Sequence, residues 1–142
     1  MTRRDVVYRL RVAQGFLDES RQDVDSNRWR SAVDNAQLSV ENAAKAVLAI
    51  VAPVGRTHSP APLLRQALEE GRFPTAFQGA VQRLAECAEI LGFDIHVQTD
   101  YGDEFQGLTP WELFDEPEAR EALAIAEEAV SLAQMTAQGI LP

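Results

Sequence analysis

The stretch Trp29–Val51, WRSAVDNAQLSVENAAKAVLAIV, decides how the rest of the chain is interpreted. Its apolar residues recur at steps of three and four, which places them on one face of an α-helix. They are Trp29, Val33, Ala36, Val40, Ala43, Val47 and Ile50. A second face carries only methyl side chains, from Ala32, Ala44, Ala46 and Ala49, so a neighbouring helix can approach closely there. The pattern predicts a central helix around which the rest of the chain packs.

Amphipathic patterns on either side of this stretch predict further helices. The first is expected over residues 4–24, and the break Asp25-Ser26-Asn27 is short enough to make it an antiparallel neighbour of the central helix. A short helix over 61–70, a third long helix over 74–92 and a last helix over 115–138 follow. The expected fold is all-α: a single domain, residues 1–142, built as an up-and-down four-helix bundle with one short extra helix.

The stretch 94–115, DIHVQTDYGDEFQGLTPWELFD, shows no helical period and is expected to form a long loop before the last helix. A structureless loop of this length is unusual in a compact domain. It contains five large apolar side chains, namely Tyr101, Phe105, Leu108, Trp111 and Phe114. Burial of these side chains is expected to hold the loop against the bundle.

The composition restricts the classes of function. The formal net charge is −9 and the sequence pI about 4.6, so tight binding of nucleic acid by the chain alone is not expected. No run approaches the ~20 apolar residues of a membrane span, and the first ten residues lack an apolar signal core, which favours a cytoplasmic protein without membrane contact. Cys87 is the only cysteine and is expected to be buried. Arginines are unevenly placed: Arg28 and Arg30 flank Trp29, and four more stand at Arg3, Arg4, Arg9 and Arg11. They allow a small basic area on an otherwise acidic protein, but a surface that serves only solubility is the preferred interpretation.

The familiar motifs for nucleotides and metals do not occur. The chain has no Walker-type glycine loop, no GxGxxG, no HExxH and no set of cysteine and histidine ligands. His96 together with Asp94, Asp100, Asp103 and Glu104 offers ligand types for a metal, but acidic clusters in loops are usually solvated. Neither a metal nor a cofactor is therefore predicted.

Two places carry residue types suited to chemistry. Lys45, the only lysine, follows Glu41 by four residues, which is the spacing of an ordinary solvated helix pair and leaves a functional lysine as the alternative. The proline-rich segment 53–62, PVGRTHSPAP, holds Arg56 and His58, which are suited to contacting a phosphate or a partner. The same two residue types also serve a metal-independent nuclease, in which histidine moves a proton and arginine stabilises the phosphorane charge.

Four features in order along the chain resemble the HEPN domain family of small helical bundles. They are the amphipathic YRLRVAQGFLDESRQDV, the alanine-rich WRSAVDNAQLSVENAAKAVL, the turn RTHSPAPLL with its histidine before a leucine pair, and TDYGDEFQGLTPWELFDEPEAREALAIAEEAV with its tyrosine-bearing loop. The resemblance implies an up-and-down bundle that usually dimerises and is often encoded beside a small nucleotidyltransferase. It also implies that many relatives are metal-independent ribonuclease toxins.

The ribonuclease motif of that family is an arginine separated from a histidine by four to six residues. No arginine stands at those distances before His58 or His96, and Asp100-Tyr101-Gly102 occupies the place of the family's Arg-Tyr-Pro. We therefore expect a non-catalytic HEPN-like module, nucleotide-binding or protein-binding, acting as a homodimer or with a nucleotidyltransferase. Its candidate ligand-binding residues are Lys45, Arg56, His58 and Tyr101. The alternative is a ribonuclease toxin of a toxin-antitoxin pair in which Arg56 and His58 are catalytic.

Overall fold

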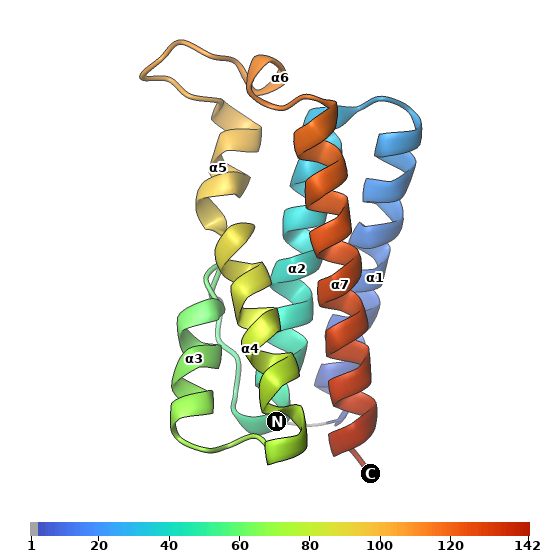
Figure 1. The fold of residues 1–142 in the computed structure, drawn as a ribbon, viewed down its shortest axis with the longest axis vertical. Helices are drawn as coiled ribbons and strands as arrows, with labels where there is room; N and C mark the ends of the chain where they lie inside the picture. The colour runs from blue at the N-terminus through green and yellow to red at the C-terminus, as the bar shows by residue number, and fades with distance from the viewer. Residues whose placement is uncertain (1–2) are drawn as a thin grey trace.

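The structure, a computed structural model, describes residues 3–142 and is all-α (Figure 1). Its helices are α1 (Arg3–Asp25), α2 (Trp29–Val51), α3 (Ala61–Glu69), α4 (Thr75–Ile90), α5 (Phe93–Tyr101), α6 (Pro110–Leu113) and α7 (Glu116–Ile140). The long helices α1, α2, α4 and α7 lie side by side as a bundle, and the short α3 packs beside α4. The predicted all-α four-helix bundle with one short extra helix is confirmed. In the described part of the chain, no helix has both the length and the apolar character of a membrane span.

Helix α2 lies at the centre of this arrangement, as its pattern predicts. It contacts α1 and α7 most extensively and also reaches α3, α4, α5 and α6. The methyl face allows close packing, because Ala32, Ala44 and Ala46 are fully buried. Two serine hydroxyls bridge the α1–α2 contact: Ser20 Oγ donates to the Ala32 carbonyl and Ser39 Oγ to the Ala13 carbonyl, each at 2.8 Å. Small side chains and satisfied hydroxyls together let the two backbones come close.

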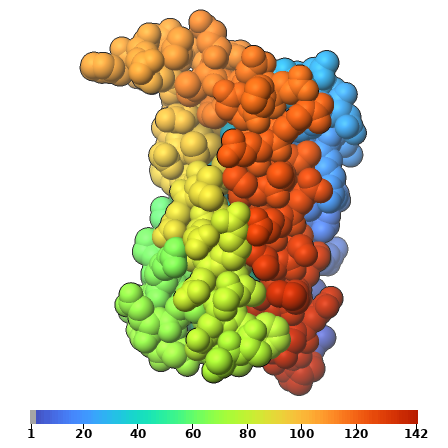
Figure 2. All heavy atoms as spheres, in the orientation of Figure 1, coloured from blue at the N-terminus to red at the C-terminus, as the bar shows by residue number. Residues whose placement is uncertain are grey.

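The predicted loop over 94–115 is much shorter in the structure, because residues 93–101 form α5 and residues 110–113 form α6. What is left between them, residues 102–109, is a hairpin-like arm closed by hydrogen bonds in both directions between Asp103 and Leu108. This arm stands off from the bundle (Figures 1 and 2). The expectation that its large side chains lie against the bundle is correct for Phe114, which is buried, and wrong for Tyr101, Phe105 and Trp111. Phe105 is 100% exposed.

Gly102 fixes the direction in which the arm leaves α5. Its φ of 69° and ψ of −149° belong to a region that essentially only glycine occupies. A Cβ at this position would lie 2.1 Å from the Leu108 carbonyl oxygen, which is backbone and cannot rotate away. The arm is therefore set by backbone geometry at its first residue.

Cys87 is fully buried on the core side of α4, as predicted. Burial raises the pKa of its thiol to about 11, because the charged thiolate would lose its hydration. The thiol is therefore protonated at neutral pH and behaves as a small apolar side chain.

Candidate functional site

A row of polar residues follows one face of α2, and the structure covers that face. Glu41 and Lys45 are only 5% and 8% exposed, and Lys45 Nζ donates to Glu41 Oε2 at 3.0 Å. The interpretation of this pair as solvated is therefore wrong. A buried ion pair takes both charges out of water, so each depends on the other for compensation. The Lys45 ammonium is not free to act as an independent cation.

His58 brings the proline-rich segment onto the same pair. Its Nδ1 lies 3.5 Å from Glu41 Oε2, so a single carboxylate oxygen faces both Lys45 and His58. The His58 side chain is still 65% exposed, and its ring stacks on Phe93 of α5 with centroids 5.2 Å apart. One edge of the imidazole therefore faces a buried acid while the rest of the ring meets solvent.

A second histidine continues this cluster along α5. His96 Nδ1 lies 3.0 Å from Asp34 Oδ1 on α2, and its Nε2 lies 3.8 Å from Asp100 Oδ2. Phe93 lies between the two histidines, with its ring centroid 5.8 Å from that of His96. Within residues 3–142, no group of three or more histidine, cysteine or acidic side chains has the arrangement of a metal site.

The candidate residues are only partly brought together. Lys45 and His58 meet through Glu41, whereas Arg56 is exposed and makes no hydrogen bond or ion pair with any residue that the structure describes. Tyr101 is exposed at the far end of α5 from Phe93. Sequence reasoning missed Phe93 as a ring partner. The spacing of seven residues between Asp34 and Glu41 was the available signal for a polar face on α2.

Charge is distributed very unevenly over this side of the molecule. The segment 84–119, called here the acidic segment, contains ten of the 22 aspartates and glutamates and none of the 13 lysines and arginines. The rest of the chain is consequently close to neutral. The acidic segment includes α5, the 102–109 arm and α6, so these elements together with the second half of α4 carry the net negative charge of the chain.

Comparisons with known proteins agree with the fold. The family model for the HEPN domain matches residues 6–135. A comparison with curated proteins finds no match. Among solved structures, the chain is similar to the crystal structure of TT1696 from Thermus thermophilus, with 21% sequence identity and a TM-score of 0.69 over 92% of this chain and 97% of that chain. At that identity the likeness concerns the fold alone.

Proposed function

The chain belongs to the HEPN domain family, and on this basis we propose that it is a non-catalytic HEPN module that works by binding another protein chain. The observation that carries the proposal is a group of large apolar side chains that are exposed on α4, α5 and the 102–109 arm. Ile90, Phe93, Val97 and Tyr101 follow one another at steps of three and four, and all are exposed. Phe105 on the arm is fully exposed as well. We call these five residues the apolar stripe.

Large apolar side chains left exposed on neighbouring segments, with polar groups around them, are typical of protein interfaces. Aromatic residues such as Phe93, Tyr101 and Phe105 are also the types that contribute most to binding energy. The stripe lies within the acidic segment, so a symmetric contact of this surface with itself would bring like charges together. A partner with basic residues around an apolar patch fits better. The small nucleotidyltransferase that often accompanies the family is the partner we propose, and homodimerisation would then use a different face.

The test is recovery of the tagged protein from its native host, identification of companions by mass spectrometry, and measurement of binding with the purified partner. The variant Tyr101→Ser/Phe105→Ser is expected to weaken that binding by about 2 kcal/mol or more, roughly 30-fold, because two interface aromatics are lost. Its thermal stability is expected to be unchanged, since both side chains are already in solvent.

Tyr8→Ser/Met135→Ser is the matched control, because it removes two exposed apolar side chains from α1 and α7. Binding of the partner by this control should equal that of the wild type. If both double variants bind as the wild type does, the apolar stripe is not the interface. If the protein elutes as a bare homodimer with no companion, the nucleotidyltransferase proposal fails.

Nucleotide binding by the residues named from the sequence has weaker support. Lys45 Nζ already donates to Glu41, so its charge is compensated before any phosphate arrives. Arg56 is the cationic candidate whose donors are uncommitted within the described residues, and Tyr101 lies exposed at the far end of α5.

A second candidate function is a metal-independent ribonuclease that uses Arg56 and His58. It is favoured by one observation: the exposed His58 ring lies 3.5 Å from the buried Glu41 carboxylate, which would orient a general base. Arg56→Ala and His58→Ala are each expected to abolish RNA cleavage and growth arrest under this candidate. Arg65→Ala, on α3, serves as the control. If Arg56→Ala and His58→Ala both cleave RNA and arrest growth as the wild type does, the ribonuclease function is excluded.

A further inference from the structure

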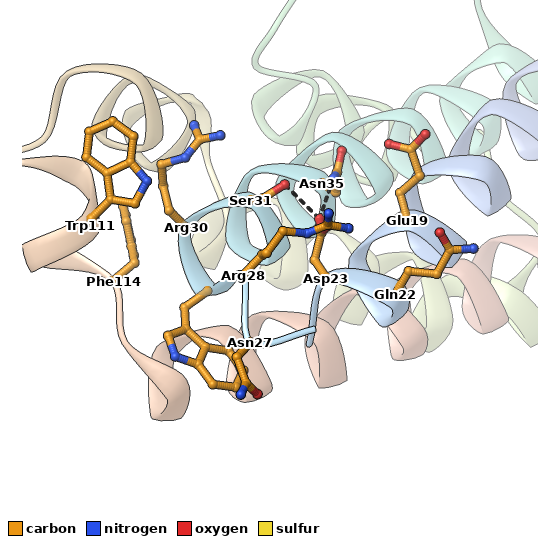
Figure 3. Close-up of a pocket in the computed structure, with 11 residues that line it drawn as sticks. Glu19, Gln22, Asp23, Asn27, Arg28, Arg30, Ser31, Asn35, Trp111 and Phe114 are labelled. Atoms are coloured by element: carbon orange, nitrogen blue, oxygen red, sulfur yellow. Dashed lines mark hydrogen bonds and ion pairs between the residues drawn. The ribbon is translucent and has the colours of Figure 1, made fainter. Parts of the chain in front are cut away.

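A cavity of about 730 Å³ lies at the end of the bundle where the α1–α2 turn meets α6 (Figure 3). Pockets for small molecules typically measure roughly 300–1,000 Å³ and combine aromatic walls with a few placed polar groups. The walls here include Trp29, Trp111 and Phe114. This site lies apart from the Glu41–Lys45–His58 cluster and does not include the apolar stripe, so its existence does not depend on the proposed function.

The floor of the cavity is the buried carboxylate of Asp23, and both of its oxygens accept hydrogen bonds. Asp23 is 4% exposed and accepts hydrogen bonds from Arg28 Nε at 3.0 Å, Ser31 Oγ at 2.8 Å and Asn35 Nδ2 at 2.7 Å. Figure 3 shows these groups converging on Asp23. Because its negative charge is already compensated by Arg28, Asp23 does not repel an anion as a bare carboxylate would. Its role is to hold the surrounding side chains in place.

Arg30 provides a positive charge at the cavity, and within residues 3–142 no salt bridge joins it to a carboxylate. Its Nη1 donates to the Thr99 carbonyl at 2.8 Å, a bond that pins the side chain to the end of α5. Its guanidinium carbon lies 5.9 Å from the centre of the Trp111 ring. No carboxylate in the described part of the chain pairs with it. Beside it, the first turn of α2 has no capping side chain and no acidic residue, so its N–H groups add to the positive potential.

The aromatic walls indicate that a ligand of this cavity contains a flat ring as well as an anionic group. Trp111 is 72% exposed, and its indole lies beside Arg30 at the mouth of the cavity (Figure 3). A flat ring placed on such an indole gains stacking contact on a surface that is otherwise in water. Trp29 and Phe114 limit the remaining space. The cavity therefore presents an aromatic surface directly beside the Arg30 cation.

We propose that this cavity binds a small molecule that combines a flat aromatic ring with an anionic group, the ring lying on Trp111 and the anion facing Arg30 and the first turn of α2. The anionic group is a phosphate or a carboxylate, since both accept the paired donors of a guanidinium. Glu19, on the opposite side of the cavity from Arg30, restricts the negative group to the Arg30 side.

The experiment is a titration followed by intrinsic tryptophan fluorescence, because the chain has only two tryptophans and both line the cavity. The probes are AMP, which joins a ring to a phosphate, and nicotinate, which joins a ring to a carboxylate. Adenosine and nicotinamide are their uncharged counterparts, and inorganic phosphate is an anion without a ring. We expect saturable quenching by AMP or nicotinate, with binding about tenfold or more tighter than for the uncharged counterpart. Which of the two binds identifies the anionic group.

Arg30→Gln is expected to weaken binding of the better probe about tenfold or more, while Arg65→Gln on α3 leaves it unchanged. Trp111→Leu should also weaken binding, with Trp29 left as the reporter. The proposal is overturned by any of four results: no saturable signal with millimolar AMP or nicotinate, equal binding of the uncharged counterparts, binding of phosphate as tight as that of AMP, or unchanged binding by folded Arg30→Gln. If Arg30→Gln does not fold, the comparison of charged with uncharged probes on the wild-type protein decides.

Discussion

Glu41→Ala is expected to lower the free energy of unfolding by about 3–5 kcal/mol, the cost of removing one partner from a buried ion pair. Lys45 is 8% exposed, and its hydrogen bond to Glu41 is the one its side chain makes among residues 3–142. Without the carboxylate, the Lys45 ammonium must lose its proton, draw in water or move out of the bundle. His58 also loses the group that faces its Nδ1. Urea unfolding followed by circular dichroism measures the change.

Glu116→Ala provides the matched control. Glu116 precedes Arg120 by four residues and binds it at 2.7 Å, but this pair is half exposed on α7. Loss of an exposed pair typically costs about 1 kcal/mol or less. The double variant Glu41→Leu/Lys45→Met should be more stable than Glu41→Ala, because it leaves no buried charge without a partner. Equal stability of Glu41→Ala and Glu116→Ala would show that Lys45 is compensated in another way.

The bundle was predictable because its helices bury the faces that their sequences mark. In α2, Val33, Val40 and Val47 recur at steps of seven and are all buried, so sequence periodicity and packing agree. In helix α5, sequence periodicity and packing do not agree. Its residues Phe93 and Val97 are exposed, Ile95 packs only partly against the core, and its fully buried residue is Thr99. A method that looks for apolar residues on a core face cannot detect such a helix.

The candidate site was harder to predict for the same reason. Whether the Glu41–Lys45 pair is solvated depends on what covers that face of α2, and the cover comes from the proline-rich segment and α5. The four-residue spacing of Glu41 and Lys45 predicts a helix pair but carries no information about what covers it. For Arg56 and His58, the sequence predicts a shared site that the structure does not form. They are close in sequence, but only His58 reaches the buried acid, since proximity in a loop does not fix the directions of side chains.

Asp23→Ala is expected to lower the free energy of unfolding by about 2–4 kcal/mol, because three donors from the start of α2 lose one charged acceptor. Hydrogen bonds to a charged group are worth about 1.5–3 kcal/mol each, but Arg28 is largely in solvent and recovers part of its share from water. Ser31 and Asn35 are less exposed and recover less. Chemical unfolding gives the total, and fluorescence of Trp29 in the Trp111→Phe background gives the local change at the α1–α2 turn.

Two variants on α1 separate loss of this network from loss of charge. Asp18→Ala removes an exposed carboxylate that also pairs with an arginine, Arg21, and is expected to cost about 0.5 kcal/mol or less. Asp23→Asn keeps the shape of the side chain but turns one acceptor into a donor, so its loss should lie between those of the two alanine variants. Because Asp23 also holds side chains at the start of α2, Asp23→Ala should weaken ligand binding by disturbing the first turn of α2, even where the bundle is still folded. A stability loss no larger than that of Asp18→Ala would mean that water replaces the carboxylate without cost, and the α1–α2 turn would then be held by apolar packing alone.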